Sequence, residues 1–175
     1  MENSNEKILE EIKNGNYENV VYLTDINSET AKLLVGNMET YIMLSGLKNI
    51  SSEVAEILVN FKGALDFDGL ENISPEIAEI LSRHEGDLYF NMLKEISPMV
   101  AEKLSKHKNR LDLNGLKSIS LELAEILSKH EGELNIAGLE NISSEIAKVL
   151  SKHNGDIIAS EEVVQKINDF KNEKI

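Results

Sequence analysis

Apolar and polar residues recur along this chain in a short pattern that changes its period partway through. Segment 65–68 reads Leu-Asp-Phe-Asp, in which every second residue is apolar, as in a strand with one buried face. A little later, Ile77, Ala78 and Leu81 have the spacing that places apolar side chains on one face of a helix. The pattern therefore predicts a short strand followed by a short amphipathic helix.

Glycine, serine and proline mark the ends of these elements. Gly69 permits a sharp turn directly after the strand. Ser74 is a typical residue to cap a helix, and Pro75 is well suited to the first helical position. Gly86 is expected to end the helix in a left-handed conformation.

The same pattern returns at Leu65, Leu88, Leu111 and Leu134, which are 23 residues apart, and two looser copies precede it. A fixed period of this length is typical of a stacked solenoid, in which a lone coil cannot fold and neighbours supply the stability. We therefore predict an α/β solenoid with a parallel sheet. One extra residue separates Ala31 from Ala55, and we expect a bulge or longer turn near residues 36–40. The predicted helix starts are Ser28, Ser51, Ser74, Ser97, Ser120 and Ser143.

The two ends of the chain have helical patterns of their own. Residues 4–13 form one amphipathic segment, and a second begins at Ser160. At 175 residues, one domain is the expectation. We predict a single solenoid domain over 1–175, with a helical cap at 1–18, six repeats at 19–158 and a second cap at 159–175.

The consensus Gly-Leu-x-x-Ile-Ser-x-Glu-x-Ala-Glu-x-Leu-Ser-x-His-x-Gly resembles the short leucine-rich-like repeats found in multiple copies in many bacterial proteins. The resemblance covers roughly residues 20–158. It implies a curved α/β solenoid for protein recognition, with a concave parallel sheet, helices on the convex side and no catalytic residues. Gly69, Gly115 and Gly138 replace the inward-facing Asn of the commonest leucine-rich repeat, which leaves open how the amides of that turn are satisfied.

Composition narrows the classes of partner and location. The net charge is −13, with 31 acids against 18 bases, which disfavours direct nucleic-acid binding and suits a basic protein surface. The chain has no cysteine, no apolar run long enough to span a membrane and no secretory signal at its start. We therefore expect a cytoplasmic protein. Glu79 and Arg83 have the spacing of an ion pair within one helix, which predicts a self-neutralised helical face.

The repeated histidines do not predict a metal site. His84, His107, His130 and His153 occupy the same position in successive coils. Helix axes lie about 8–10 Å apart, whereas zinc holds each imidazole at about 2.0–2.1 Å. We expect these side chains to bond the last carbonyls of their own helices. The Ser-Lys-His triplets also recur once per coil, so we predict no catalytic residues, no cofactor and no enzyme.

The outward strand positions are the candidate binding surface. Neighbouring parallel strands lie about 4.8 Å apart, so equivalent residues should form three columns. These columns hold six acids and one base, a net charge of −5. Tyr89 between Asp66 and Asp112 suits Arg and Lys side chains, and Arg110 is placed to bridge Asp87 and Glu133. The candidate residues are Tyr41, Met43, Asp66, Asp68, Asp87, Tyr89, Asn91, Arg110, Asp112, Asn114, Glu133 and Asn135.

The leading hypothesis is a protein-binding module whose acidic concave face engages a basic protein. One form of it is an inhibitor that mimics nucleic acid on a nuclease or similar defence enzyme. The alternatives are a generic scaffold or host-directed effector without such mimicry and, third, an enzyme on the concave sheet. The sequence does not indicate the oligomeric state.

Overall fold

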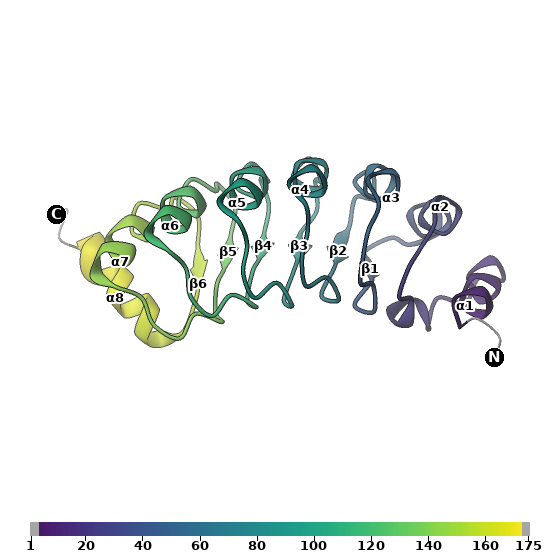
Figure 1. The fold of residues 1–175 in the computed structure, drawn as a ribbon, viewed down its shortest axis with the longest axis horizontal. Helices are drawn as coiled ribbons and strands as arrows, with labels where there is room; N and C mark the ends of the chain where they lie inside the picture. The colour runs from purple at the N-terminus through teal and green to yellow at the C-terminus, as the bar shows by residue number, and fades with distance from the viewer. Residues whose placement is uncertain (1–3, 173–175) are drawn as a thin grey trace.

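A computed structural model describes residues 4–172, in which strands and helices alternate along a row of coils (Figure 1). The strands form a parallel six-stranded sheet in chain order, which confirms the predicted parallel stack. The row arches, with the helices of the coils along its outer edge (Figure 1). The strands are β1 (Tyr41–Met43), β2 (Ala64–Asp66), β3 (Leu88–Tyr89), β4 (Leu111–Asp112), β5 (Leu134–Asn135) and β6 (Ile157–Ile158).

The helices of the central coils are short, and longer helices stand at both ends of the row. The end helix α1 packs against α2, and α8 packs against α7. None of the described helices has the length and apolar composition needed to cross a membrane. The helices are α1 (Ser4–Lys13), the 3-10 helix η1 (Val20–Tyr22), α2 (Ser28–Asn37), α3 (Ser52–Leu58), α4 (Pro75–Leu81), α5 (Pro98–Leu104), α6 (Leu121–Leu127), α7 (Ser144–Leu150) and α8 (Glu161–Asn172).

Serine caps start the helices of five coils, as the sequence predicted. Ser74 Oγ accepts the backbone N–H of Ile77 at 3.2 Å, and the equivalent serines do the same. Each such cap contributes about 1 kcal/mol. In the first coil the predicted helix start is confirmed, but the capping residue is Asn27, whose side chain accepts the N–H of Thr30 at 2.9 Å. Ser28 is there the first residue of the helix.

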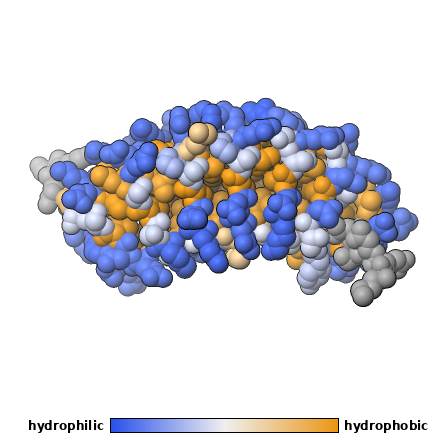
Figure 2. All heavy atoms as spheres, viewed as in Figure 1, coloured by the Kyte–Doolittle hydropathy of each residue, from blue (hydrophilic) through white to orange (hydrophobic). Residues whose placement is uncertain are grey.

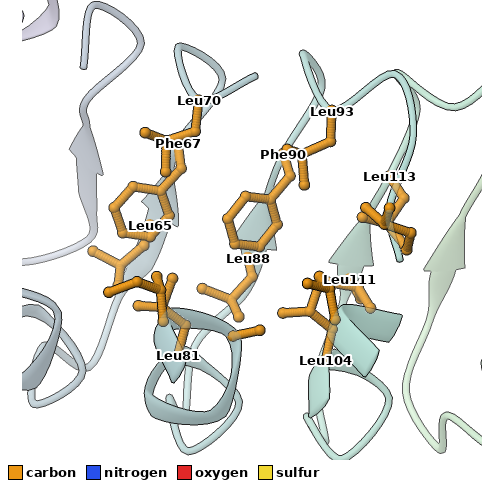
Figure 3. Close-up of a cluster of buried hydrophobic side chains, with 14 of the residues drawn as sticks. Leu65, Phe67, Leu70, Leu81, Leu88, Phe90, Leu93, Leu104, Leu111 and Leu113 are labelled. Atoms are coloured by element: carbon orange, nitrogen blue, oxygen red, sulfur yellow. The ribbon is translucent and has the colours of Figure 1, made fainter. Parts of the chain in front are cut away.

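The core lies between the sheet and the helices and runs the length of the row. Leu65, Phe67, Leu70 and Leu81 are each fully buried, and the same positions of the next coil pack beside them (Figure 3). Phe67 stacks on Phe90 with ring centroids 5.6 Å apart. A band of hydrophobic residues extends lengthwise between hydrophilic edges on the face seen in Figure 2. Each coil therefore buries its apolar side chains against both neighbours.

Two details of the backbone differ from the sequence-based expectations. Gly86 is not left-handed; among the described residues only Gly15, after α1, has a positive φ, at 79°. A Cβ at position 86 would lie 2.0 Å from the Gly63 carbonyl oxygen, so glycine is needed there for close approach of coils. The extra residue near 36–40 forms no bulge, because α2 continues to Asn37 and spans 10 residues, against 7 in α3.

Ion pairs on the helical face connect neighbouring coils. Arg83 pairs with Glu56 of the preceding coil at 2.5 Å, and Lys106 pairs with Glu79 at 3.4 Å. The predicted pairing of Glu79 with Arg83 inside one helix was therefore wrong. These groups are about half exposed, so solvent screens both pairs and their contribution to stability is small.

The four histidines form a buried ladder. Neighbouring rings are nearly parallel, with centroids 6.4, 6.1 and 6.1 Å apart along the stack. His84 Nε2 lies 2.9 Å from the Gly63 carbonyl, and His153 Nε2 lies 3.1 Å from the Gly132 carbonyl. A carbonyl only accepts, so these nitrogens carry the proton. In His84 and His153 the expected bonds to the carbonyls of the same helix are replaced by bonds to the preceding coil, whereas the ring nitrogens of His107 and His130 are buried without a hydrogen-bond partner among the described residues.

Protonation of this ladder is unfavourable in the folded chain. Burial, followed by repulsion from His130 and His84, lowers the pKa of His107 to about 4. Burial also lowers the pKa of His84, His130 and His153. Among the charged groups nearby, Asp87 raises the pKa of His84 and His107, whereas Lys62 lowers that of His84 and Lys171 that of His153. Burial is the largest cause for all four rings.

The ladder predicts a loss of stability in mild acid. An unfolded His has a pKa of about 6.5, so below that pH the unfolded chain binds more protons than the folded one. The free energy of unfolding should therefore fall as the pH drops from about 6.5 toward the folded pKa of about 4. In His107→Phe, which keeps a flat ring in the stack and cannot titrate, this fall should be smaller. Urea unfolding at several pH values measures both slopes, and equal slopes would contradict the prediction.

Candidate functional site

The outward residues of the strands lie in columns, as the sequence predicted. The register pairs Met43 with Asp66, Asp66 with Tyr89, Tyr89 with Asp112, and Asp112 with Asn135. The first column lies alongside, with Tyr41 paired to Ala64. We name the surface formed by the outward strand positions and the residues directly after them the open sheet face.

The residues of the middle column are less exposed than the sequence suggested. Asp66, Asp112 and Asn135 are only 6%, 3% and 8% exposed. In contrast, Met43 is 45% exposed, and Tyr89 is half-buried. Asp66 and Asp112 therefore present little carboxylate surface to a partner.

The buried carboxylates and amide of the middle column hold the turn that follows each strand. Asp66 Oδ1 accepts the N–H of Asp68 at 2.7 Å, and Asp112 Oδ1 accepts that of Asn114 at 3.2 Å. Asn135 Oδ1 accepts the N–H of Ala137 at 3.0 Å. A side chain that bonds the backbone two residues on is a standard way to satisfy a turn. These bonds satisfy one backbone N–H in each of the turns that contain Gly69, Gly115 and Gly138.

Tyr89 interrupts this arrangement, and the preceding coil compensates. A tyrosine offers no carboxylate to the turn, and the N–H of Asn91 is instead accepted by Asp68 Oδ1 at 2.9 Å. Asn91 Nδ2 donates to the other oxygen of Asp68, also at 2.9 Å. Asp68 and Asn91 therefore connect the second and third strands, and their side chains are partly committed to the fold.

Arg110 is held between two carboxylates and a ring. Its Nη1 lies 2.7 Å from Glu133 Oε1, and its Nη2 lies 3.1 Å from Asp112 Oδ2. The guanidinium carbon is 5.5 Å from the centroid of the Tyr89 ring, a distance suited to a cation–π contact. The predicted bridge to Glu133 is confirmed. The second predicted partner was wrong, because Asp87 accepts the backbone N–H of Arg110, at 3.3 Å, rather than its guanidinium.

Two tyrosines meet over the N-terminal half of the sheet. The rings of Tyr41 and Tyr89 are 5.8 Å apart and tilted by 45°. They belong to β1 and β3, whose backbones are about 9.6 Å apart at the usual strand spacing, so the rings lean toward each other above β2. Burial, followed by the charge of Asp66, raises the pKa of the Tyr41 hydroxyl. Burial, followed by the charge of Asp87, raises that of Tyr89.

Three acids in this half of the face make no side-chain ion pair among the described residues. Among the described ion pairs, none involves Asp66, Asp68 or Asp87, whereas Asp112 and Glu133 share Arg110. The pKa of Asp66 is raised, mainly by burial. The hydrogen bond from the Asp68 N–H acts in the opposite direction, and the charge of Asp68 adds to the increase. The N-terminal half therefore combines two aromatic rings with uncompensated negative charge.

Two other groups of side chains in the described part of the chain, the histidines and the serine triplets, show no comparable arrangement. Within the described residues, no three His, Cys, Asp or Glu side chains are placed to hold a metal ion. In the Ser-Lys-His triplet at 105–107, Ser105 Oγ donates to the Glu102 carbonyl at 3.0 Å, as the equivalent serines do in their coils. These serines satisfy the ends of their helices.

Comparison with known proteins found no family model, no curated protein and no solved structure that matches the chain.

The turn network predicts that one acid of this face acts mainly in stability. Asp112→Ala removes the acceptor of Asn135 Nδ2, of the Asn114 N–H and of Arg110. We expect the free energy of unfolding to fall by roughly 2–4 kcal/mol, because buried donors and a charge lose their partner.

The matched control is Asn114→Ala, an exposed position two residues after the end of the same strand. It should change the free energy of unfolding by at most about 0.5 kcal/mol. Urea denaturation measures both variants. A small effect of Asp112→Ala would contradict the structural role.

Proposed function

We propose that the chain is a leucine-rich-repeat-like protein whose open sheet face binds a basic surface of another protein. The observation that carries this proposal is a group of acids without a described ion-pair partner beside the Tyr41 and Tyr89 rings on the open sheet face. Outside this face, Glu56, Glu79, Glu85 and Glu131 each pair with a lysine or arginine of a neighbouring coil, whereas the helical acids Glu53, Glu102 and Glu125 take part in no described ion pair. On the open sheet face, Asp66, Asp68 and Asp87 take part in no described ion pair. Basic residues of a partner would supply the positive charges with which these acids can pair.

A nucleic-acid-binding enzyme is the partner class that we propose. Such an enzyme has a basic groove, and carboxylates on adjacent strands can take the place of phosphates in it. The acids of the first column, Asp87, Glu133 and Asp156, are partly or fully exposed and therefore suited to this role. A chain without cysteine suits the reducing cytoplasm, which is the location we propose.

The test removes charge from the first column without disturbing the buried turn network. The triple variant Asp87→Asn, Glu133→Gln and Asp156→Asn should bind its partner at least about tenfold more weakly, with a shallower dependence on salt. Proteins that the wild-type chain retains from a native lysate at low salt would be identified, purified and titrated against each variant. Duplex DNA should compete for a partner that binds through a nucleic-acid groove.

The control is Glu53→Gln, Glu102→Gln and Glu125→Gln, which removes the same charge from exposed helical positions with no described ion pair. This variant should bind within about twofold of wild type, because surface charges beyond a Debye length of about 10 Å are largely screened. Equal weakening by both triple variants would remove the open sheet face from the proposal.

A further inference from the structure

Arg110 shows which ligand chemistry the open sheet face holds. Its guanidinium contacts an acid in the next coil of the first column, Glu133, and an acid in the middle column of its own coil, Asp112. The ring of Tyr89 in the preceding coil forms the third side. A planar cation between a ring and two carboxylates is the setting for which Arg is better suited than Lys.

The repeat places Ala64 at the equivalent of Arg110, two coils earlier. Both residues directly precede the aligned leucines, Leu65 and Leu111. The neighbours also correspond, because Asp87 follows in the next coil of the first column and Asp66 lies in the middle column of the same coil. Ala64 has no charged side chain, so the acids are repeated here without the cation.

Aromatic and apolar groups surround this position. Tyr41 pairs with Ala64 in the sheet register, and Met43 pairs with Asp66. The Tyr41 and Tyr89 rings lean over β2, which contains Ala64. Asp66 is only 6% exposed, so it would act on a ligand here through its electrostatic field rather than through a direct contact. Asp87 is half-buried and accessible to a partner, and its Oδ2 is 3.5 Å from the Tyr89 hydroxyl.

We propose that the place above Ala64 receives an arginine side chain of the partner protein, stacked on the Tyr41 and Tyr89 rings and paired with Asp87. The inference rests on the proposed function and names the group that its basic partner contributes. The rings provide a cation–π surface, and Asp87 takes the part that Glu133 takes for Arg110. A guanidinium therefore fits better here than an ammonium group.

The experiment introduces an arginine of the chain itself at the proposed site. Ala64→Arg puts a guanidinium where the partner's would lie, and Ala137→Arg adds the same charge to an exposed alanine elsewhere on the open sheet face. The probes are two synthetic peptides of equal length, one alternating Arg with Gly and the other Lys with Gly. Titration calorimetry measures affinity, and circular dichroism verifies that each variant is folded.

Wild type should prefer the arginine peptide by roughly two- to fivefold, the range of an exposed cation–π contact. Ala64→Arg should weaken binding of that peptide by at least about tenfold and abolish the preference, because the site is filled. Ala137→Arg should weaken it by less than about threefold and keep the preference, since only distant charge has changed.

Equal weakening by both variants, or no preference for arginine in wild type, would overturn the inference. In that case a loss of partner binding in the Asp87, Glu133 and Asp156 triple variant would still support the acidic face as the binding surface. If that triple variant also bound normally, the proposed function would fall as well. Failure of wild type to bind either peptide would overturn the arginine site.

Discussion

The fold depends on side-by-side stacking of coils at the spacing of a parallel sheet. A single coil buries too few apolar side chains to offset the conformational entropy of ordering its backbone, so each coil needs its neighbours. At this spacing every side chain meets its equivalent in the next coil. Phe67 stacks on Phe90, and the four imidazoles stack in one ladder. Close approach also leaves no room for a Cβ at Gly86, beside the carbonyl of Gly63.

The close spacing of the coils also determines which polar groups on the sheet hold the turns and which remain accessible to a partner. A strand of two or three residues must turn at once, and its turn needs an acceptor. Asp66, Asp112 and Asn135 supply it and are buried as a result. What remains available is the exposed rim of the first column and the two tyrosine rings. A surface that looks uniformly acidic in sequence is therefore a row of turn acceptors beside a smaller set of free acids.

Local signals in the sequence predicted the coil well. The five serine caps, the parallel sheet and the column of Met43, Asp66, Tyr89 and Asp112 all follow from periodicity and from residues close in sequence. The errors concern contacts between coils. Arg83 has acids available in its own helix and in the preceding one, and only packing selects Glu56. The low exposure of Asp66 could not be predicted from the alternation of the strand, because its carboxylate accepts the N–H of Asp68 and the hydroxyl of Ser45 in the preceding coil.

By itself, the sequence determined the length of the coil, the order of its elements and which residues share a column, because these depend on spacing along one chain. Only the tertiary structure decided which members of a column are accessible to a partner and which are bonded within the fold. Tyr89 has acids on both sides in its column, yet its ring joins Tyr41 on one side and lies beneath Arg110 on the other. Side chains 23 residues apart, such as Asp68 and Asn91, bond to one another across coils, and only the packing of the coils decides which groups pair in this way.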